Sequence, residues 1–510
     1  MAAYVNAFQV NPTDDVATLL DDGRTGDVAR ARDGVEQTLL ADIPRGHKVA
    51  LRPLRAGEPV RRYGQVIGFA TEAIAPGAHV HTHNLGLGAV EKDYAFGAEA
   101  RPVAPAETPR TFMGYARPDG RVGTRNTVLV IAAANCAASV VRKIAATFDE
   151  DVLADYPNVD AVAPVIHWSG CGLGAGEELA MLRRTLAGFA RHPNVAGCVL
   201  VGLGCEVNQM SGLLDSLGLV MPGEPVIPRI LIQDVGGVGP AVRAGVDAVY
   251  KLLERANECR RTEQPASRLT VALECGGSDA YSGLTANPAV GAAADKLVAQ
   301  GGTVILSETP EIYGAEHLLT RRAVSEAVGR ALVERIHWWE DYAARNGVTL
   351  DNNPSPGNKA GGLTTIYEKS LGAVSKGGST PLVAVYRYAE RVTARGLCFM
   401  DTPGYDPVSV TGMVAGGATV IVFTTGRGSV FGIQPAPTVK VATNTPLYER
   451  MSGDMDIDAG RVISAGMSVK AVGAEIFEKV LATASGERTK GELAGVGADE
   501  FAPWIPSATL

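Results

Sequence analysis

The sequence predicts a multidomain α/β protein, and three observations support that prediction. The chain has 510 residues, more than one hydrophobic core usually holds, so two or three domains are expected. Short strand-like runs separated by glycine turns fill residues 38–84, which is typical of a small β domain. From residue 127 onwards, buried-strand runs alternate with helix-like stretches, which predicts mostly parallel sheets.

Each predicted strand of the larger part is a short, strongly apolar run. These strands are expected at 128–131, 199–204, 269–273, 303–306, 382–385 and 419–423. Longer stretches with helix-forming residues are predicted to be helices at 139–148, 288–299, 323–345 and 471–485. The segment 91–112 is rich in alanine, proline and glutamate, and we expect a linker there.

Composition argues against several classes of protein. A formal net charge of −8 and a pI near 5.6 argue against a nucleic-acid partner, because phosphate binding needs a basic surface. No apolar run reaches the roughly 18–20 residues that span a membrane, and the first residues lack the pattern of a secretory signal. Seven cysteines, an odd number, favour reduced thiols and a cytoplasmic protein.

The most informative segment is the loop that follows the predicted strand 269–273. It carries Glu274, Cys275, Ser278 and Asp279 together with two glycines. A hydrophobic core has no use for this mixture, and glycines let backbone N–H groups approach a ligand closely. Because α/β folds bind ligands at the carboxyl ends of their strands, the loop predicts part of a functional site.

Three histidines alternate in one short segment, at His79, His81 and His83. On a strand, this spacing places the three imidazoles on one face. There they could bind a metal or work as acid and base, and the spacing does not distinguish the two. The alternative is the solvent-facing side of an edge strand. Because the whole chain has only eight histidines, we favour a functional role.

Four cysteines follow or end predicted strands, namely Cys136, Cys171, Cys205 and Cys275. His167 precedes the second of them by four residues, and Glu206 directly follows the third. Thiolates and imidazoles favour iron or zinc over magnesium, so one interpretation is a metal site. The other is that these thiols are small apolar residues without a chemical role.

Further polar segments also follow predicted strands. Glu308 and Glu311 come just after the strand 303–306, where a carboxylate could act as a base, bind a metal, or complement a helix dipole. Two rigid or glycine-rich loops could hold an anionic substrate, although such loops also occur without one. Their candidate side chains are Asn358, Lys359 and Arg427.

Taken together, these segments resemble the altronate dehydratase and galactarate dehydratase family. The motifs that carry the resemblance lie at 46–51, 62–68, 79–84, 114–126, 202–206, 274–279, 353–359 and 425–428. The resemblance covers nearly the whole chain and implies a β-clip (SAF-like) domain at 1–90. It further implies an α/β middle domain at 113–265, often used for dimer contacts, and a Rossmann-like catalytic domain at 266–510. A homodimer or larger homo-oligomer is therefore expected.

The resemblance also implies an activity. A sugar acid such as D-altronate would lose water and give a 2-keto-3-deoxy acid. The alternatives are a galactarate dehydratase, which the segment 318–324 resembles, a lyase similar to sulfolactate sulfo-lyases, and a non-catalytic sugar-acid-binding protein. The implied cofactor is Fe²⁺. Mn²⁺ is one alternative, and an iron–sulfur cluster held by three cysteines is another.

This hypothesis assigns three roles, since dehydration benefits from a Lewis acid, an acid–base pair and groups that hold the substrate. The expected metal ligands are Cys136, His167, Cys171, Cys205, Glu206 and Cys275. The expected catalytic residues are His79, His81, His83, Asp279 and Glu308, with the histidines closing over the site from the first domain. The expected substrate-binding residues are Ser278, Asn358, Lys359 and Arg427.

Overall fold

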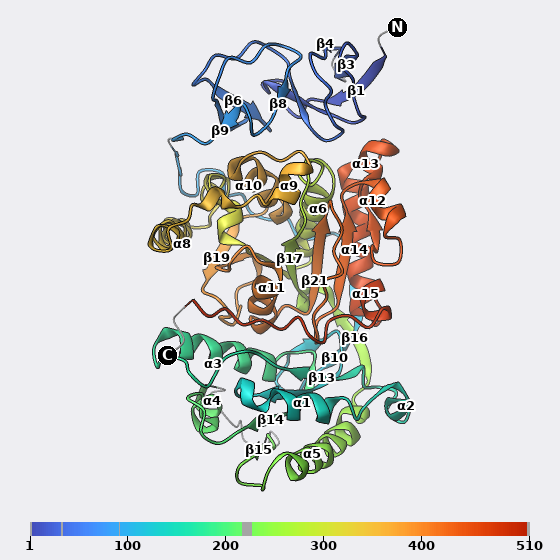
Figure 1. Cartoon of the computed structure of the whole chain (residues 1–510). Coiled ribbons are helices and arrows are strands. Elements are labelled where there is room, and N and C mark those ends of the chain that lie inside the picture. Colours follow the sequence, from blue (N-terminus) through green and yellow to red (C-terminus); the bar gives the residue numbers. More distant parts are fainter. Residues whose placement is uncertain (1–2, 32–33, 91, 217–226, 507–510) are drawn as a thin grey trace.

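The computed structural model describes residues 3–31, 34–90, 92–216 and 227–506. Three parts are stacked in an elongated molecule, and the part that comes last in the sequence lies in the middle of the stack (Figure 1). Within the described residues, no helix is both long and apolar enough to cross a membrane.

The first part is a small β domain, as the sequence predicts. Its larger sheet has the strand order β4-β3-β1-β2-β5-β8, and a second sheet has the order β6-β7-β9. The strands are β1 (Tyr4–Phe8), β2 (Val16–Leu19), β3 (Val28–Ala31), β4 (Glu36–Thr38), β5 (Lys48–Ala50), β6 (Pro59–Arg62), β7 (Gln65–Ala70), β8 (His79–Val80) and β9 (Leu85–Gly86). The β structure therefore begins well before residue 38, where the glycine turns first suggested it.

The chain then crosses the third part before it enters the second. Gly97 N donates to Thr320 O at 3.0 Å, and Ala106 N donates to Ala299 O at 2.9 Å. From residue 97 to residue 106 the chain has no helix or strand, and these bonds attach it to the third part. Strands β10 (Thr111–Ala116), β11 (Val122–Gly123) and β16 (Arg261–Pro265) then form an antiparallel sheet.

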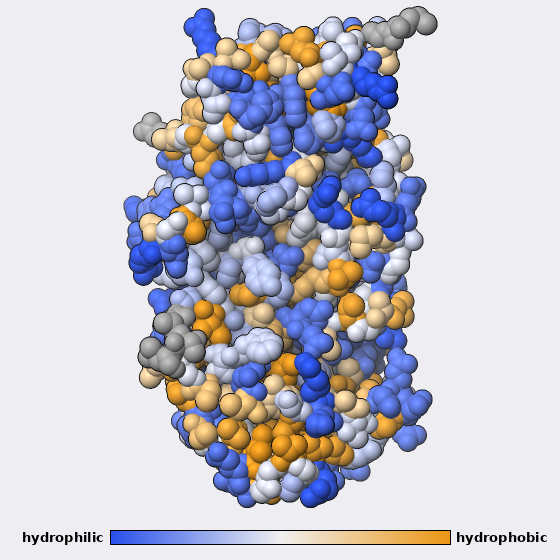
Figure 2. Space-filling view, viewed as in Figure 1, coloured by the Kyte–Doolittle hydropathy of each residue, from blue (hydrophilic) through white to orange (hydrophobic). Residues whose placement is uncertain are grey.

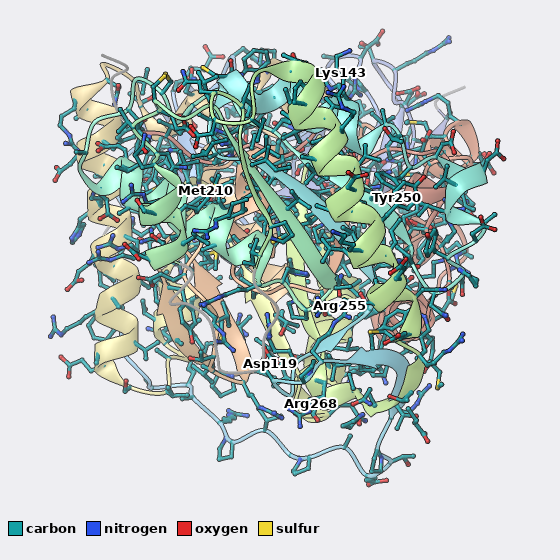
Figure 3. All side chains as sticks on the ribbon, turned by 90° about the horizontal axis from the view of Figure 1, so that it is seen from below. Asp119, Lys143, Met210, Tyr250, Arg255 and Arg268 are labelled. Atoms are coloured by element: carbon teal, nitrogen blue, oxygen red, sulfur yellow. The ribbon has the colours of Figure 1, made fainter. Side chains whose placement is uncertain are left out.

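The middle domain has a parallel sheet with helices on both faces. The strand order is β13-β12-β14-β15, with β12 (Thr127–Ala132), β13 (Ala161–Val165), β14 (Val195–Gly202) and β15 (Arg229–Leu231). Alternate residues of β12 pack into two different cores. Helices α1 (Ala138–Ala145) and α5 (Val238–Glu258) cover one face, and α3 (Glu177–Ala190) covers the other. Seen from below, α5 lies across the sheet (Figure 3).

The third domain has a seven-stranded parallel sheet in the order β19-β20-β18-β17-β21-β22-β23. The strands are β17 (Thr270–Cys275), β18 (Thr303–Leu306), β19 (Leu382–Tyr386), β20 (Gly396–Met400), β21 (Val420–Thr425), β22 (Thr438–Ala442) and β23 (Ile457–Asp458). The predicted strands at 269–273, 303–306, 382–385 and 419–423 are confirmed, whereas β20, β22 and β23 were missed.

The helices of this domain are α6 (Ala286–Ala299), α7 (His317–Thr320), α8 (Glu326–Arg345), α9 (Pro356–Ala360), α10 (Ile366–Val374), α11 (Asp406–Ala415), α12 (Thr445–Arg450), α13 (Arg461–Ser464), α14 (Val469–Ala484) and α15 (Lys490–Leu493). Three of them, α6, α8 and α14, begin within three residues of the predicted positions, and the other helices were not predicted. The predicted helix at 323–345 begins three residues later, because the Ser325 side chain accepts from Val328 N and caps it there.

The two ends of the seven-stranded sheet meet different domains. At the amino end of β21, Thr124 Oγ1 of the middle domain donates to Thr419 O at 2.7 Å. At the carboxyl end of the sheet, Lys48 Nζ of the first domain donates to Gly362 O at 2.7 Å. In α/β sheets, ligands bind at the carboxyl end of the strands. The first domain therefore covers the edge where a site is expected.

Candidate functional site

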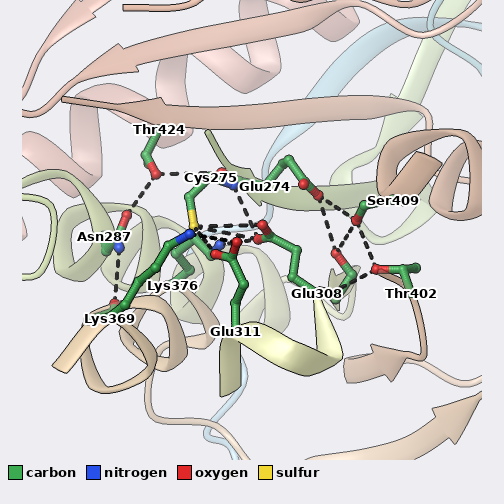
Figure 4. A network of polar contacts seen from close by, with 12 residues as sticks. Glu274, Cys275, Asn287, Glu308, Glu311, Lys369, Lys376, Thr402, Ser409 and Thr424 are labelled. Atoms are coloured by element: carbon green, nitrogen blue, oxygen red, sulfur yellow. Dashed lines mark hydrogen bonds and ion pairs between the residues drawn. The ribbon is translucent and has the colours of Figure 1, made fainter. Parts of the chain in front are cut away.

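A network of buried charges lies at the carboxyl edge of the seven-stranded sheet (Figure 4). Strand β17 ends in Glu274 and Cys275, the loop after β18 supplies Glu308 and Glu311, and α10 with the turn after it supplies two lysines. All six side chains are buried. They are Glu274, Cys275, Glu308, Glu311, Lys369 and Lys376.

Each of the two central carboxylates is paired with its own lysine. Lys376 Nζ lies 2.5 Å from Glu308 Oε2, and Lys369 Nζ lies 2.6 Å from Glu311 Oε1. Cys275 Sγ lies 3.5 Å from Oε2 of both carboxylates. The thiol therefore lies between two ion pairs that come from separate elements.

The two carboxylates differ in proton affinity because their surroundings differ. Burial raises the pKa of Glu308, and the nearby Lys376 opposes this only in part. For Glu311, burial acts in the same direction, but Lys369 and Lys376 outweigh it and lower the pKa. Burial and the charge of Glu308 raise the pKa of the Cys275 thiol, which therefore stays protonated. Carboxylates with separated pKa values are suited to acid–base work.

Two further carboxyl groups adjoin this network. Glu274 accepts a hydrogen bond from Ser409 Oγ at 2.8 Å, and burial, then Glu308 and Asp406, raise its pKa. Asp406 begins α11, and burial followed by the charge of Glu308 raises its pKa to about 7. At neutral pH the region therefore holds carboxyl groups in more than one protonation state.

Glu308 is held in an uncommon backbone conformation. Its φ of +65° lies in the left-handed region, which costs a non-glycine residue about 1–3 kcal/mol. Its backbone N–H donates to Thr402 Oγ1 at 2.9 Å, and its carboxylate reaches Lys376. The surrounding bonds therefore fix this carboxylate in a strained position, as is typical of functional residues.

The histidines of the first domain form a second cluster. His47 joins the predicted group, and its Nδ1 lies 3.0 Å from His79 Nε2. Donor atoms of His47, His79 and His81 all lie within 4.8 Å of one another. The prediction of one strand face is wrong, because β8 ends at Val80 and the chain turns back. Asn84 fixes this turn by donating to His79 O at 2.9 Å.

The clustered imidazoles are neutral, so their ring nitrogens can bind a metal ion. Burial and then the neighbouring histidines lower the pKa of His79 to about 3. Burial and the charge of Lys48 lower the pKa of His81 to about 4. His81 Nδ1 is buried without a hydrogen-bond partner among the described residues. The exposed His83 ring lies 5.3 Å from that of His79. Neutral imidazoles with a free nitrogen can hold a metal ion.

Helix α10 links the two clusters. Glu368 faces the first domain, where it pairs with Lys48 at 3.0 Å and with Arg62, and the next residue, Lys369, faces Cys275 and Glu311. Burial would raise the pKa of Glu368, but the two cations outweigh it and lower the pKa to about 2. Burial dominates for Lys48, whose pKa falls to about 8.

A small cavity of about 10 Å³ lies between the clusters. Tyr63 of the first domain lines it together with Cys275, Ser278 and Lys369 of the third. Ser278 Oγ is buried without a hydrogen-bond partner among the described residues. A space of this size holds about one water molecule, so this cavity is too small for a sugar acid.

Two predicted site residues form hydrogen bonds that hold the loop after β17. Both carboxylate oxygens of Asp279 are already occupied, by Ser282 and Thr443 at Oδ1 and by Thr443 and Asn444 at Oδ2. These hydrogen bonds hold the carboxylate within the loop, and the role of Asp279 as an acid or base stays a prediction. Asn358 closes the capping box of α9 and donates to Ser278 O at 2.8 Å, so its amide is committed to the loop.

The structure also separates the predicted metal ligands. Cys136, Cys171 and Cys205 belong to the middle domain, which packs at the amino end of the seven-stranded sheet, whereas Cys275 lies at its carboxyl end. The length of β17, about 16 Å at the usual rise per residue, intervenes. One metal site that includes Cys275 and the other three cysteines is therefore excluded.

Two more predicted ligands have backbone partners. His167 is buried, its Nε2 lies 3.0 Å from Ala132 O, and its Nδ1 accepts from Ser169 N. Both ring nitrogens thus have backbone partners in this structure, and the role of His167 as a metal ligand stays a prediction. Glu206 Oε2 accepts from Gly204 N at 2.6 Å, which leaves only Oε1 without a partner among the described residues.

The predicted cationic residues lie at the rim of the same edge. Arg427 is exposed after β21, and its N–H donates to Gly277 O at 2.9 Å. Lys359 is half-buried on α9, next to Ala360, whose carbonyl lies 3.3 Å from His47 Nε2. Both therefore flank the loop that follows β17.

Sequence reasoning missed several central residues. His47 and Lys48 lie in a motif that was interpreted only as a strand, and the helix that carries Glu368 and Lys369 was not predicted. A usable signal existed, because two lysines, Lys369 and Lys376, interrupt a largely apolar stretch that begins at Ile366. Charged residues on the apolar face of a helix are rarely buried without a partner.

Comparisons with known proteins agree with this organisation. Residues 5–87 match the "Altronate/galactarate dehydratase SAF domain". Residues 114–257 match the "D-galactarate dehydratase/Altronate hydrolase, second domain". Residues 266–509 match the "D-galactarate/Altronate dehydratase, C-terminal" model. The chain therefore has a SAF domain at its N-terminus, followed by two domains with parallel sheets.

Three curated relatives align with most of the chain. The galactarate dehydratase (L-threo-forming) of Escherichia coli strain K12 is 39% identical, over 94% of this chain and 93% of that protein. The altronate dehydratase of Bacillus subtilis strain 168 is 34% identical, over 94% and 95%. The (2R)-sulfolactate sulfo-lyase subunit beta of Chromohalobacter salexigens is 33% identical, over 76% and 95%. The chain belongs to the altronate/galactarate dehydratase family.

Proposed function

We propose that this chain is a hydro-lyase that eliminates water from a sugar acid, such as D-altronate or galactarate, to give a 2-keto-3-deoxy acid. The observation that carries the proposal is the buried group of Glu308, Glu311, Lys369 and Lys376 around Cys275, at the carboxyl edge of the sheet. The names of the relatives from Escherichia coli and Bacillus subtilis support the same reaction class.

The reaction requires a base, an acid and stabilisation of negative charge. A weakly acidic proton leaves the carbon next to the carboxylate, and hydroxide leaves the neighbouring carbon. Glu308, whose pKa is raised, is suited to accept the proton. The ammonium groups of Lys369 and Lys376 would stabilise the negative charge on an enolate oxygen. At the rim, Arg427 and Lys359 would bind the substrate carboxylate.

We assign the implied divalent metal to His47, His79 and His81, with Fe²⁺ as the ion and Mn²⁺ as the alternative. Their neutral imidazoles and the unpartnered His81 Nδ1 fit such an ion. When bound, the ion would act as a Lewis acid on a substrate oxygen. The Cys275 group fits a metal less well, because its carboxylates are already paired with lysines and its thiol is protonated.

The closed cavity implies that the first domain moves to admit substrate. A sugar acid cannot enter a space of about 10 Å³, so the histidines would close over the substrate after it binds. We further propose that the third domain is Rossmann-like. Its strand order supports this, because the chain leaves β17 towards β18 on one side and returns to β21 on the other.

We also propose that the protein is a cytoplasmic homodimer or larger homo-oligomer. Apolar residues gather at the lower end of the molecule, over the middle domain (Figure 2). Exposed Val235, Val238 and Tyr250 belong to this domain, and apolar surface of this kind supports self-association through it.

The function is tested with a substrate panel. Altronate, galactarate, glucarate and sulfolactate are incubated with the reduced protein and Fe²⁺ or Mn²⁺, and 2-keto acid and sulfite are measured. We expect 2-keto acid without sulfite from at least one sugar acid. Turnover of sulfolactate alone would identify a sulfo-lyase instead, and no turnover of any substrate would contradict the proposal.

Variants then test the assignment of roles. Glu308→Gln should lower kcat by about 100-fold or more, because the base is lost, whereas the exposed Glu326→Gln should not change it. His79→Ala should lower the affinity for Mn²⁺ by at least about 10-fold, and the exposed His337→Ala should leave it unchanged. Normal Mn²⁺ binding by His79→Ala would contradict the placement of the metal.

A further inference from the structure

One residue next to the charge network has no role so far. Asn353 begins the polar segment 353–359, whose other candidate side chains lie within the loop or at the rim. It follows the short helix η4 (Leu350–Asn352) and precedes α9. The residue is half-buried, and its amide reaches the buried ion pair that Glu311 and Lys369 form. Asn353 therefore belongs to the network, although no strand of the sheet carries it.

The amide closes a triangle with both charged groups. Asn353 Nδ2 donates to Glu311 Oε1 at 2.7 Å, and Asn353 Oδ1 accepts from Lys369 Nζ at 2.8 Å. Lys369 Nζ itself lies 2.6 Å from Glu311 Oε1. An amide has one accepting and one donating end, and the reverse orientation would point its N–H groups at the ammonium. The two charges thus fix the orientation of the amide, and the amide holds both charges.

The loop that carries this amide is attached on both sides of Asn353. On one side, Asp351 Oδ1 accepts from Ile366 N at 2.9 Å, and Ile366 is the first residue of α10, the helix that carries Lys369. On the other side, the Ser355 side chain caps α9. The position of the amide relative to α10 is therefore set by neighbouring hydrogen bonds and not by the amide alone.

A glycine from another segment packs against the same two groups. Gly404 follows β20, and a Cβ at this position would lie 3.0 Å from Glu311 Oε1 and 3.2 Å from Asn353 Nδ2. A side chain there would press on the carboxylate and on the amide at once. The loops after β18 and β20 and the loop before α9 therefore meet at these atoms and fix the distances between them.

The other ion pair of the network lacks such an amide. Glu308 Oε2 accepts from Lys376 Nζ at 2.5 Å and from the backbone N–H of Cys275 at 3.2 Å. Among the described residues, the one hydrogen-bond contact of Glu308 Oε1 is the Cys275 thiol, 3.9 Å away. Both oxygens of Glu311, by contrast, lie within 3.5 Å of a donor. Of the two carboxylates, Glu308 therefore has the oxygen that is most free to accept a proton.

We propose that Asn353 is a positioning residue of the dehydratase site. Its amide holds Glu311 and Lys369 as one fixed ion pair, which leaves Glu308 as the carboxylate that accepts a proton from the substrate. This role rests on the proposed function.

The proton transfer that this arrangement serves is the first half of the elimination. The proton leaves the carbon next to the substrate carboxylate for Glu308 Oε1, the C–H electron pair forms the double bond, and hydroxide leaves the neighbouring carbon with the C–O electron pair. Without the amide, Glu311 and Lys369 would each lose a short polar contact. The ion pair could then shift towards Cys275 and Glu308, and proton transfer would slow because its geometry is no longer fixed.

The test uses Asn353→Leu, which keeps the approximate size of the side chain and removes both hydrogen bonds. On a sugar acid that the wild type converts, this variant should lower kcat by about 10-fold or more and change KM by less than about 3-fold, because only the reacting geometry is disturbed. With substrate deuterated at the carbon next to the carboxylate, the variant should show a primary isotope effect on kcat, since proton transfer limits its rate.

Two further variants serve as comparisons. Asn353→Gln keeps the amide and should recover part of the lost kcat. Asn352→Leu, at the exposed neighbouring position, should match the wild type. Thermal melting verifies that each variant is folded.

Failure of the proposed function and failure of this role give different results. No turnover of any sugar acid by the wild type contradicts the proposed function, and this role with it. Where the wild type is active, an unchanged kcat in folded Asn353→Leu overturns the role of Asn353 alone. A raised KM with unchanged kcat also overturns it, because the amide would then bind the substrate instead. So does a lower kcat without an isotope effect, or an equal loss in Asn352→Leu.

Discussion

The ion pair of Lys376 and Glu308 shows how a single residue governs this site. Both side chains are 1% exposed, and 2.5 Å separates Lys376 Nζ from Glu308 Oε2. Removing one partner of a buried pair leaves an uncompensated charge, which costs about 3–5 kcal/mol. The pair therefore holds the strained Glu308 in place, and Lys376 offsets part of the rise in pKa that burial causes.

Replacing this lysine should destabilise the protein. We expect Lys376→Met to lower the free energy of unfolding in urea at pH 7 by about 3 kcal/mol. Adding Glu308→Gln should recover at least half of that loss, because the buried charge is removed as well. Arg330→Met, in the exposed pair with Glu326, should cost less than about 0.5 kcal/mol. Equal costs for Lys376→Met and Arg330→Met would contradict the role of burial.

At the scale of elements, the position of Lys376 depends on how α6 packs. Gly291 of α6 faces the turn that carries Lys376, and a Cβ at Gly291 would lie 2.2 Å from Ser375 O. Because the obstacle is backbone, it cannot rotate away as a side chain could. Gly291 therefore sets how closely α6 and this turn approach each other. That distance in turn determines where Lys376 lies relative to the sheet.

A methyl group at this contact should be poorly tolerated. Gly291→Ala should lower the free energy of unfolding by about 1–3 kcal/mol and reduce kcat, since the turn must shift. Gly239→Ala on α5, whose Cβ would meet nothing closer than 3.6 Å, should stabilise the protein by about 0.5–1 kcal/mol. Chemical denaturation measures the stability of each variant, and steady-state kinetics measures its kcat. An unchanged kcat in Gly291→Ala would contradict the role of this glycine in positioning Lys376.

At the scale of the whole molecule, Glu368 holds the first domain against the third. It pairs with Lys48, which is 320 residues away in sequence, and with Arg62. Its pKa is lowered from 4.5 to about 2, so the stability it contributes is present above pH 4.5 and is lost as the pH falls towards 2. Lys48 acts oppositely, because its lowered pKa of about 8 means that burying its charge costs stability at neutral pH.

Acid should therefore loosen the contact between these domains. We expect stability to fall by about 3 kcal/mol between pH 5 and pH 2, as the carboxylate is protonated. The Glu368→Gln variant should be less stable than the wild type at neutral pH. Its stability should also fall less between pH 5 and pH 2, because it lacks this carboxylate. Melting temperatures measured across this pH range test it, with the exposed Glu475→Gln as the control. An unchanged slope in Glu368→Gln would contradict the assignment.

Most individual strands and helices follow from local sequence. Apolar runs such as 303–306 can hardly be anything but buried strands, and the polar loop after β17 marks the functional edge because ligands in α/β sheets bind at strand carboxyl ends. Family membership also follows from motifs, since these are local. The histidine segment could likewise be recognised in the sequence. Its turn could not, because the hydrogen bonds of Asn84 define that turn.

The tertiary structure decided which of these residues act together. His47, Lys369 and Lys376 join the site through contacts between segments far apart in the sequence, and burial in those contacts sets the proton affinities. The same packing places Cys275 at one end of a sheet and the other candidate cysteines beyond its opposite end. Local sequence determines the helices and strands and the polar residues at their ends. The distances between site residues and the dielectric around them determine their chemistry, and these arise only when distant segments pack together.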